Sequence, residues 1–114
     1  MRVVIKIVSI LIILLGVIHL RYAFPLQVNE NMLWYVGAGM TVIFAGLINF
    51  VAIERGGSKF SLIIAVIVNA INFGMFCFAL AVYNEPLCYI NLMISGISTI
   101  AFIATLIKTY KISN

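Results

Sequence analysis

Four long runs of apolar residues, separated by short polar connections, occupy most of the chain. A helix that crosses the hydrocarbon core of a bilayer needs about 20 mostly apolar residues. The runs predict four such helices, over residues 3–24, 33–53, 60–83 and 87–107. Residues that favour turns, such as Pro25, Gly56, Gly57 and Pro86, lie in the breaks. The pattern therefore predicts four membrane-spanning helices joined by short connections.

Short connections make consecutive helices antiparallel neighbours. We therefore expect an all-α fold, an integral membrane antiparallel four-helix bundle in which residues 1–114 form a single transmembrane domain. The basic residues divide unequally between its two faces, with Arg21 alone on one side. On the other side lie Arg2, Lys6, Arg55, Lys59, Lys108 and Lys111. Because Lys and Arg are retained on the cytoplasmic side, the N and C termini are both predicted to be cytoplasmic.

The composition excludes a soluble globular domain. Hydrophobic residues make up 65% of the chain and charged residues 9%, with a mean hydropathy of +1.24. A soluble domain has roughly 25% charged residues. The 7 Lys and Arg residues are scattered among apolar runs and form no basic face, so we expect no nucleic-acid partner.

Each predicted helix carries a stripe of small or polar residues. In lipid, small residues let helices approach closely, and amide or hydroxyl side chains hydrogen-bond between helices. The stripes are Ser9, Gly16 and His19; Gly37, Thr41, Ala45 and Asn49; Asn69 and Asn72; and Asn91, Ser95, Ser98 and Thr105. We expect these stripes to face inward. Two interpretations stay open: the polar groups tie the helices together, or they line a hydrated path across the membrane.

His19 is the only histidine, and ionisable residues inside a membrane span are candidates for function. It lies about one turn from the outer end of its helix, where a structural bond to headgroup water or a loop carbonyl is the alternative. We expect a polar outer mouth around it. The other residues of this mouth are Arg21, Tyr22, Glu30, Trp34, Tyr35, Glu85, Tyr89 and Asn91. Arg21 is expected to pair with Glu30 or Glu85.

The sequence offers no reaction centre. A hydrolytic triad needs a base and an orienting acid, yet His19 is the sole imidazole and no carboxylate lies within a predicted span. One histidine with Cys77 and Cys88 cannot complete a zinc site, and we expect both cysteines to be free thiols. We expect no metal and no cofactor. Haem held by His19 and a methionine, or a quinone, remains as an alternative.

Three segments resemble small four-helix bacterial membrane proteins of DoxX-like organisation. They are Gly16-Val17-Ile18-His19-Leu20, Leu33-Trp34-Tyr35-Val36-Gly37-Ala38-Gly39 and Gly46-Leu47-Ile48-Asn49. The resemblance implies a four-helix fold and a multi-pass location in the bacterial inner (plasma) membrane. DoxX-like proteins are associated with quinone- or thiol-linked redox complexes, but this chain has no paired cysteines that would support such a role.

These observations favour a non-enzymatic small membrane protein, either an accessory or assembly subunit or a binder of a lipidic ligand. The first alternative is a small transporter or channel that forms a homo-oligomer. Its path would be the polar seam, by which we mean the polar residues of the four stripes together. The second is a redox subunit with haem or quinone. Expected partners are membrane lipids and either further copies of the chain or a larger membrane complex. The candidate binding or conduit residues are His19, Arg21, Trp34, Tyr35, Thr41, Asn49, Asn69, Asn72, Glu85, Tyr89, Asn91, Ser95 and Ser98.

Overall fold

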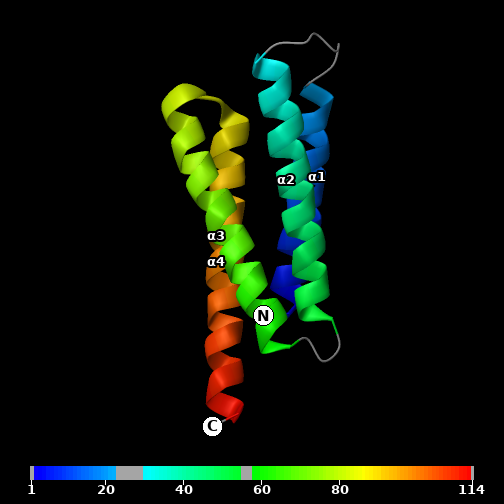
Figure 1. The fold of residues 1–114 in the computed structure, drawn as a ribbon, viewed down its shortest axis with the longest axis vertical. Coiled ribbons are helices and arrows are strands. Elements are labelled where there is room, and N and C mark those ends of the chain that lie inside the picture. The colour runs from blue at the N-terminus through cyan, green and yellow to red at the C-terminus, as the bar shows by residue number, and fades with distance from the viewer. Residues whose placement is uncertain (1, 23–29, 55–57, 114) are drawn as a thin grey trace.

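The four apolar runs form four helices in the computed structural model, which describes residues 2–22, 30–54 and 58–113 (Figure 1). The helices are α1 (Arg2–Tyr22), α2 (Glu30–Ile53), α3 (Lys59–Val82) and α4 (Pro86–Ser113). Each is long and apolar enough to cross a membrane. The prediction of four long apolar helices is therefore confirmed. They lie along the long axis of a bundle that measures 53 × 25 × 20 Å, with both chain ends toward its lower end in Figure 1.

Two helices extend beyond a predicted end by more than one residue. α2 begins at Glu30 instead of Leu33, and α4 continues to Ser113 instead of ending at residue 107. Hydropathy marks where apolar residues stop, whereas a helix continues for as long as its backbone hydrogen bonds do. The predicted end of the first helix at residues 23 and 24 lies outside the described residues.

The connections at the two ends of α3 are short and capped. The Ser61 N–H donates to the Ser58 hydroxyl oxygen at 3.1 Å, so Ser58 is an N-cap residue for α3. Tyr83 is the C-cap residue, and Pro86 occupies the first turn of α4, where its missing N–H costs nothing. The turn between α3 and α4 therefore spans only residues 83–85.

Buried positions recur at alternating intervals of three and four residues in every helix. An average repeat of about 3.5 residues is typical of helices that pack side by side at a shallow angle. The buried series are Ile5, Val8, Ile12, Leu15 and His19; Ala38, Val42, Ala45, Asn49 and Ala52; Leu62, Ala65, Asn69, Asn72, Phe76 and Ala79; and Cys88, Asn91, Ser95, Ser98 and Phe102. Each helix thus presents one seam to its neighbours.

This repeat corrects the prediction that Gly37, Thr41, Ala45 and Asn49 share one inward face. Ala45 and Asn49 are buried, but Gly37 is exposed and Thr41 is only half-buried. A helix turns about 100° per residue, so each step of four residues rotates the stripe by about 40°. Over three such steps the stripe leaves the interface, and Ala38 and Val42 occupy the buried positions in its place.

α1 and α2 form the closest helix pair, and glycines make that approach possible. A Cβ atom added at Gly16 would lie 2.8 Å from the Gly39 carbonyl oxygen, and one at Gly39 would lie 2.8 Å from the Gly16 carbonyl oxygen. A Cβ atom at Gly46 would lie 2.5 Å from Cγ1 of Ile13. Small residues of this kind permit the backbones of two apolar helices to pack directly against each other.

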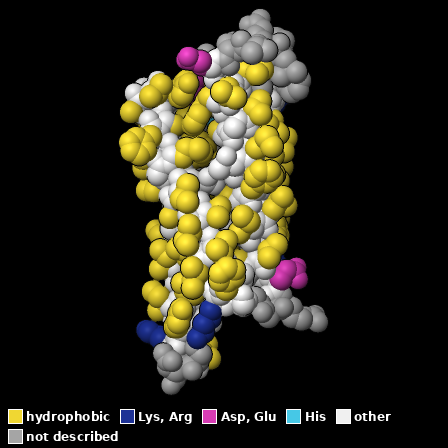
Figure 2. Space-filling model, in the orientation of Figure 1, with side chains coloured by type: hydrophobic (Ala, Val, Ile, Leu, Met, Phe, Trp, Pro, Cys, Tyr) yellow, Lys and Arg dark blue, Asp and Glu magenta, His cyan; other side chains and the backbone are white. Residues whose placement is uncertain are grey.

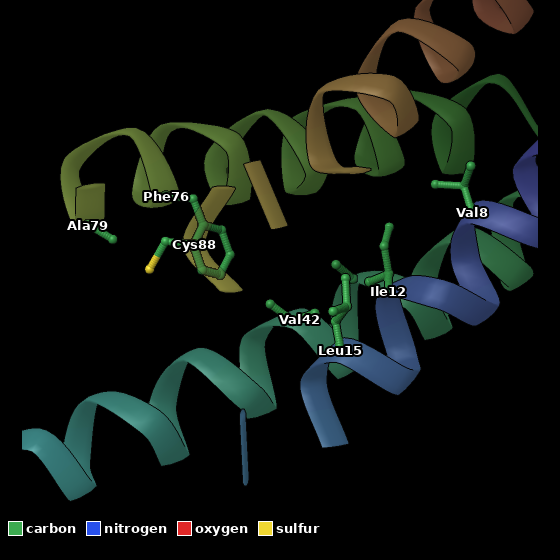
Figure 3. Packing of buried hydrophobic residues seen from close by; sticks show 8 residues of the cluster. Val8, Ile12, Leu15, Val42, Phe76, Ala79 and Cys88 are labelled. Carbon is green, nitrogen blue, oxygen red and sulfur yellow. The ribbon is translucent and has the colours of Figure 1, made fainter. Parts of the chain in front are cut away.

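The core consists of two apolar clusters with polar side chains between them. The first cluster joins α1, α2, α3 and α4 through Val8, Ile12, Leu15, Val42, Ala45, Phe76, Ala79 and Cys88 (Figure 3). The second contains Ile5, Ala52, Ile53, Leu62, Ala65, Ala101 and Phe102. Asn49, Asn69 and Ser98 occupy the seam positions between these clusters. The polar groups therefore form a layer inside an otherwise apolar core.

The surface is also apolar. Phe44, Phe78 and Ile100 are 54%, 82% and 69% exposed. Figure 2 shows hydrophobic side chains covering the middle of the visible face, with Lys and Arg gathered at the lower end. An apolar surface of this extent is unlike that of a soluble monomer and suits contact with lipid or with another apolar surface.

We predict that Gly39→Ala destabilises the protein whereas Gly37→Ala does not. The added methyl group at Gly39 meets the backbone of α1, which costs about 1–3 kcal/mol. Nothing lies within 4 Å of a Cβ atom added at Gly37, so the better helix propensity of alanine is expected to leave stability unchanged or slightly raised. The difference in melting temperature is measured by heating each variant in detergent and monitoring the folded fraction by size-exclusion chromatography. Equal melting temperatures for the two variants would contradict the close packing of α1 on α2.

Candidate functional site

A pocket opens at the upper end of the bundle, where the α3–α4 turn meets α2. It has a volume of about 330 Å³ and is lined by Tyr22, Tyr35, Glu85, Pro86, Leu87 and Ile90. We call it the upper pocket. Three of its lining residues belong to the polar mouth expected from the sequence, namely Tyr22, Tyr35 and Glu85. The structure therefore brings together part of the predicted site.

Tyr35 and Glu85 connect α2 to the turn between α3 and α4, and thereby join the two helix pairs, α1 with α2 and α3 with α4, which we call hairpins. The Tyr35 hydroxyl donates toward both carboxylate oxygens of Glu85, at 3.0 and 3.1 Å. Backbone hydrogen bonds hold Glu85 in place, because its N–H donates to the Tyr83 carbonyl and its own carbonyl accepts from the Cys88 N–H. One hydroxyl supplies a single hydrogen, so the carboxylate keeps capacity to accept further hydrogen bonds. Glu85 is thus a positioned acceptor at the mouth of an otherwise mostly apolar pocket.

His19 lies beneath the upper pocket and is buried, with 1% of its surface exposed. Its Nδ1 atom is 3.1 Å from the Leu15 carbonyl oxygen, one turn earlier in α1. Since a carbonyl only accepts, Nδ1 carries the hydrogen in this bond. The ring therefore bonds to its own helix, inside the core, instead of to the headgroup water or loop carbonyl of the structural alternative.

Six aromatic rings form a continuous chain across the upper end of the bundle. Tyr22 stacks on Tyr35 with ring centroids 5.6 Å apart, and Tyr35 lies 6.2 Å from His19. His19 contacts Phe76 edge-on at 5.8 Å. From Phe76 the chain continues to Trp34 at 6.3 Å and ends where Trp34 stacks on Tyr83 at 5.2 Å. The rings come from α1, α2 and the α3 segment, so they close the upper part of the core.

The middle of the polar seam is a hydrogen-bonded cluster of Asn49, Asn69 and Ser98. The Asn69 Nδ2 atom donates to Asn49 Oδ1 at 2.6 Å and lies 2.7 Å from the Ala65 carbonyl oxygen. The Asn49 Nδ2 atom donates to the Ser98 hydroxyl oxygen at 3.1 Å. All three side chains are buried, and each comes from a different helix. The cluster therefore ties α2, α3 and α4 together at one depth.

The remaining seam residues differ in what they contact. Asn91 and Ser95 are buried, and the Asn91 Nδ2 atom donates to the Leu87 carbonyl at 2.9 Å. The Thr41 hydroxyl donates to the Gly37 carbonyl at 2.7 Å on its own helix and joins nothing across the interface. Asn72 Oδ1 and Ser9 Oγ are buried without a hydrogen-bond partner among the described residues. The polar seam is thus hydrogen-bonded between helices at its middle, whereas these two flanking atoms have no hydrogen-bond partner among the described residues.

Other predicted mouth residues do not converge on the upper pocket. Arg21 is exposed in the last turn of α1 and makes no ion pair within residues 2–22, 30–54 and 58–113, while Tyr35 is the residue that engages Glu85. The predicted pairing of Arg21 with Glu30 or Glu85 is therefore not formed. Tyr89 is exposed and donates to Asn84 Oδ1 at 2.9 Å. Trp34 is half-buried in the aromatic chain, and its Nε1 atom has no partner among the described residues.

The structure also contains a second cavity that the sequence pattern did not reveal. It lies at the lower end, has a volume of about 490 Å³, and is called the lower cavity below. Its lining residues are Arg2, Ile5, Ala52, Ile53, Glu54, Leu62, Ala104, Thr105, Lys108 and Thr109. From the sequence, Arg2 and Lys108 indicate only the orientation of the chain. The one sequence feature that points to their proximity is that both lie at the same end of the predicted helices.

Comparison with models of protein families, with curated proteins and with solved structures finds no match. Within the described part of the chain, no group of three or more His, Cys, Asp or Glu residues is placed to hold a metal ion. Cys77 and Cys88 are both free, as expected, with Cys77 exposed and Cys88 buried. The geometry described above is therefore the basis for any functional assignment.

We predict that Asn69→Leu destabilises the bundle by about 1–3 kcal/mol, because it leaves the amide oxygen of Asn49 buried without its donor. Thr41→Val is the matched control, since the hydroxyl that it removes bonds only to its own helix. We expect this control to change stability by less than about 0.5 kcal/mol. The free energy of unfolding of both variants is measured by adding SDS to mixed micelles and monitoring the fluorescence of Trp34. If Thr41→Val lost as much stability as Asn69→Leu, the importance of the cluster would be contradicted.

Proposed function

We propose that this chain is a multi-pass protein of a bacterial inner membrane that binds a lipidic ligand in the upper pocket and catalyses no reaction itself. In this proposal the four helices form an antiparallel transmembrane bundle with both termini cytoplasmic, so the upper end faces outward. The length and hydropathy of the helices support the membrane placement. The excess of basic residues at the lower end supports the orientation.

The observation that carries the binding proposal is the acceptor at the mouth of the upper pocket. Glu85 presents a carboxylate, held by Tyr35, beside the apolar surfaces of Pro86, Leu87 and Ile90. An amphiphile places its polar head and its apolar chain against surfaces of these two kinds. The aromatic faces attract cations of any kind, and the carboxylate also accepts hydrogen bonds, so the preferred head is a cation that donates them, such as a primary ammonium group.

A binding role is supported over a conduit by the contacts in the seam. The polar cluster uses its hydrogen-bonding groups between helices, and the aromatic chain fills the upper part of the core. A water-filled path needs polar groups that face an open lumen. We propose that the protein is an accessory or assembly subunit of a larger membrane complex. In this role the bound lipid, or the bundle itself, contacts a partner protein.

The test is a comparison of lipid binding by native mass spectrometry. We expect the delipidated protein to bind phosphatidylethanolamine, whose ammonium group donates hydrogen bonds, more tightly than phosphatidylcholine of the same chain length, whose head has no N–H. Glu85→Gln is expected to remove this preference, with a loss of about tenfold in affinity for phosphatidylethanolamine. Glu30→Gln is the matched control, because Glu30 is exposed at the start of α2 and does not line the pocket.

Two results would overturn the proposal. The first is equal binding of the two lipids by the unaltered protein. The second is an equal loss of affinity for phosphatidylethanolamine in Glu85→Gln and Glu30→Gln. That result would show that the affinity depends on the net charge of the upper end and not on the pocket. A photoreactive phosphatidylethanolamine that labels α2 and the start of α4 would support the upper pocket as the location.

A second candidate function is a conduit through a homo-oligomer, and one observation favours it. Asn72 Oδ1 and Ser9 Oγ are buried without partners in the described residues, and water would satisfy both. This alternative predicts potassium or proton flux into proteoliposomes that Asn72→Leu abolishes. Flux that is absent, or unchanged in Asn72→Leu, would leave the binding function as the better proposal.

A further inference from the structure

The lower cavity combines charged groups with an apolar wall. Ile5, Ala52, Ile53 and Leu62 are buried residues of the second core cluster, and their side chains form one side of the cavity. Arg2, Glu54 and Lys108 are exposed and lie at its rim, on α1, at the end of α2 and on α4. At about 490 Å³ the cavity falls within the range of roughly 300–1,000 Å³ found for small-molecule sites.

Among the described lining residues, the side chains with hydrogens to donate to a ligand are the two basic ones, Arg2 and Lys108. The Thr105 hydroxyl donates to the Ala101 carbonyl at 2.8 Å, and the Thr109 hydroxyl donates to the Thr105 carbonyl at 2.9 Å. These hydroxyl groups have committed their hydrogens and present only acceptor oxygens to a ligand. Arg2 and Lys108 therefore supply the positive charge and the N–H groups, and they suit an anionic oxygen such as that of a phosphate.

The charges at the rim specify the ligand further. Among the described lining residues, Arg2 and Lys108 against Glu54 leave one net positive charge. A phosphodiester carries one negative charge, so it balances the charge of these three groups. The hydroxyl groups of a glycerol head would find acceptors in the Glu54 carboxylate and the Thr105 oxygen. The apolar wall beside them suits the first methylene groups of acyl chains.

We propose that the lower cavity binds an anionic phospholipid, with its phosphodiester between Arg2 and Lys108 and the start of its chains against Ile5, Ala52, Leu62 and Ala104. The inference rests on the membrane placement in the proposed function and is independent of the upper pocket. Basic pockets between helices at the cytoplasmic side of a membrane bind the anionic heads of lipids. The site would anchor the ends of α1, α2 and α4 to one lipid molecule.

The experiment measures binding of phosphatidylglycerol to the delipidated full chain by native mass spectrometry. The double variant Arg2→Gln/Lys108→Gln is expected to lose about tenfold in affinity. The matched control is Lys6→Gln/Lys111→Gln, which removes the same charge from exposed residues outside the cavity lining. Ala104→Phe keeps every charge and fills the cavity from a half-buried position, and it is expected to lose affinity as well. Size-exclusion chromatography verifies that each variant is folded.

Several outcomes would overturn the inference. An equal loss in the two double variants would show only diffuse attraction to the basic end. Normal phosphatidylglycerol binding by Ala104→Phe, together with displacement by millimolar inorganic phosphate, would indicate a phosphate site instead of a lipid site. No preference for phosphatidylglycerol over phosphatidylcholine would exclude an anionic ligand. Glu85→Gln separates the two proposals, because it should weaken phosphatidylethanolamine binding and leave phosphatidylglycerol binding unchanged.

Discussion

The hydrogen bonds among Asn49, Asn69 and Ser98 are the interaction on which the rest of the arrangement depends. Apolar side chains pack almost as well after a small shift of one helix along another, whereas buried amides find their partners at one offset only. Tyr35 and Asn49 lie on one seam, two seven-residue repeats apart, and Asn69 and Tyr83 are related in the same way. The offset that pairs the two asparagines therefore also brings Tyr35 to Glu85 and Trp34 to Tyr83.

The hairpins contribute a second level of order. Glycines let α1 and α2 pack directly against each other along Gly16, Gly39 and Gly46, and this pair forms one unit of the bundle. The other unit is α3 and α4, joined by a turn of three residues. Contacts between the two units are made by side chains: the apolar clusters, the polar cluster and the aromatic chain. The upper pocket lies where one hairpin meets the other, which explains why its lining comes from both.

The two ends of the bundle have complementary chemistry. The upper pocket offers a carboxylate and aromatic faces and therefore accepts hydrogen bonds. The lower cavity offers a guanidinium and an ammonium group, which donate hydrogen bonds, beside the acceptor Glu54. In both places the charged group lies next to an apolar wall, which is the arrangement that an amphiphile requires. In the two functions that we propose for these ends, they hold lipid molecules of different head chemistry in opposite leaflets.

Local features of the sequence determined much of this protein. Apolar runs determined the four helices, since a long apolar stretch with few breakers is helical wherever it is buried or in lipid. Polar residues such as Asn49, Asn69, Asn91 and Ser98 were correctly expected to face inward, because each comes at a position with helical periodicity. The mouth was predicted in part, since Tyr22, Tyr35 and Glu85 line one pocket.

Only the tertiary structure decided the rotation and offset of each helix, and with them the partner of each side chain. Thr41 is only half-buried, at the margin of the interface, because a four-residue stripe drifts around its helix and the seam between helices does not follow it. Glu85 bonds to Tyr35 instead of Arg21 because packing between the hairpins brings that hydroxyl to the α3–α4 turn. The lower cavity gathers residues from all four helices. Such sites depend on distances between helices, which no local pattern along the chain contains.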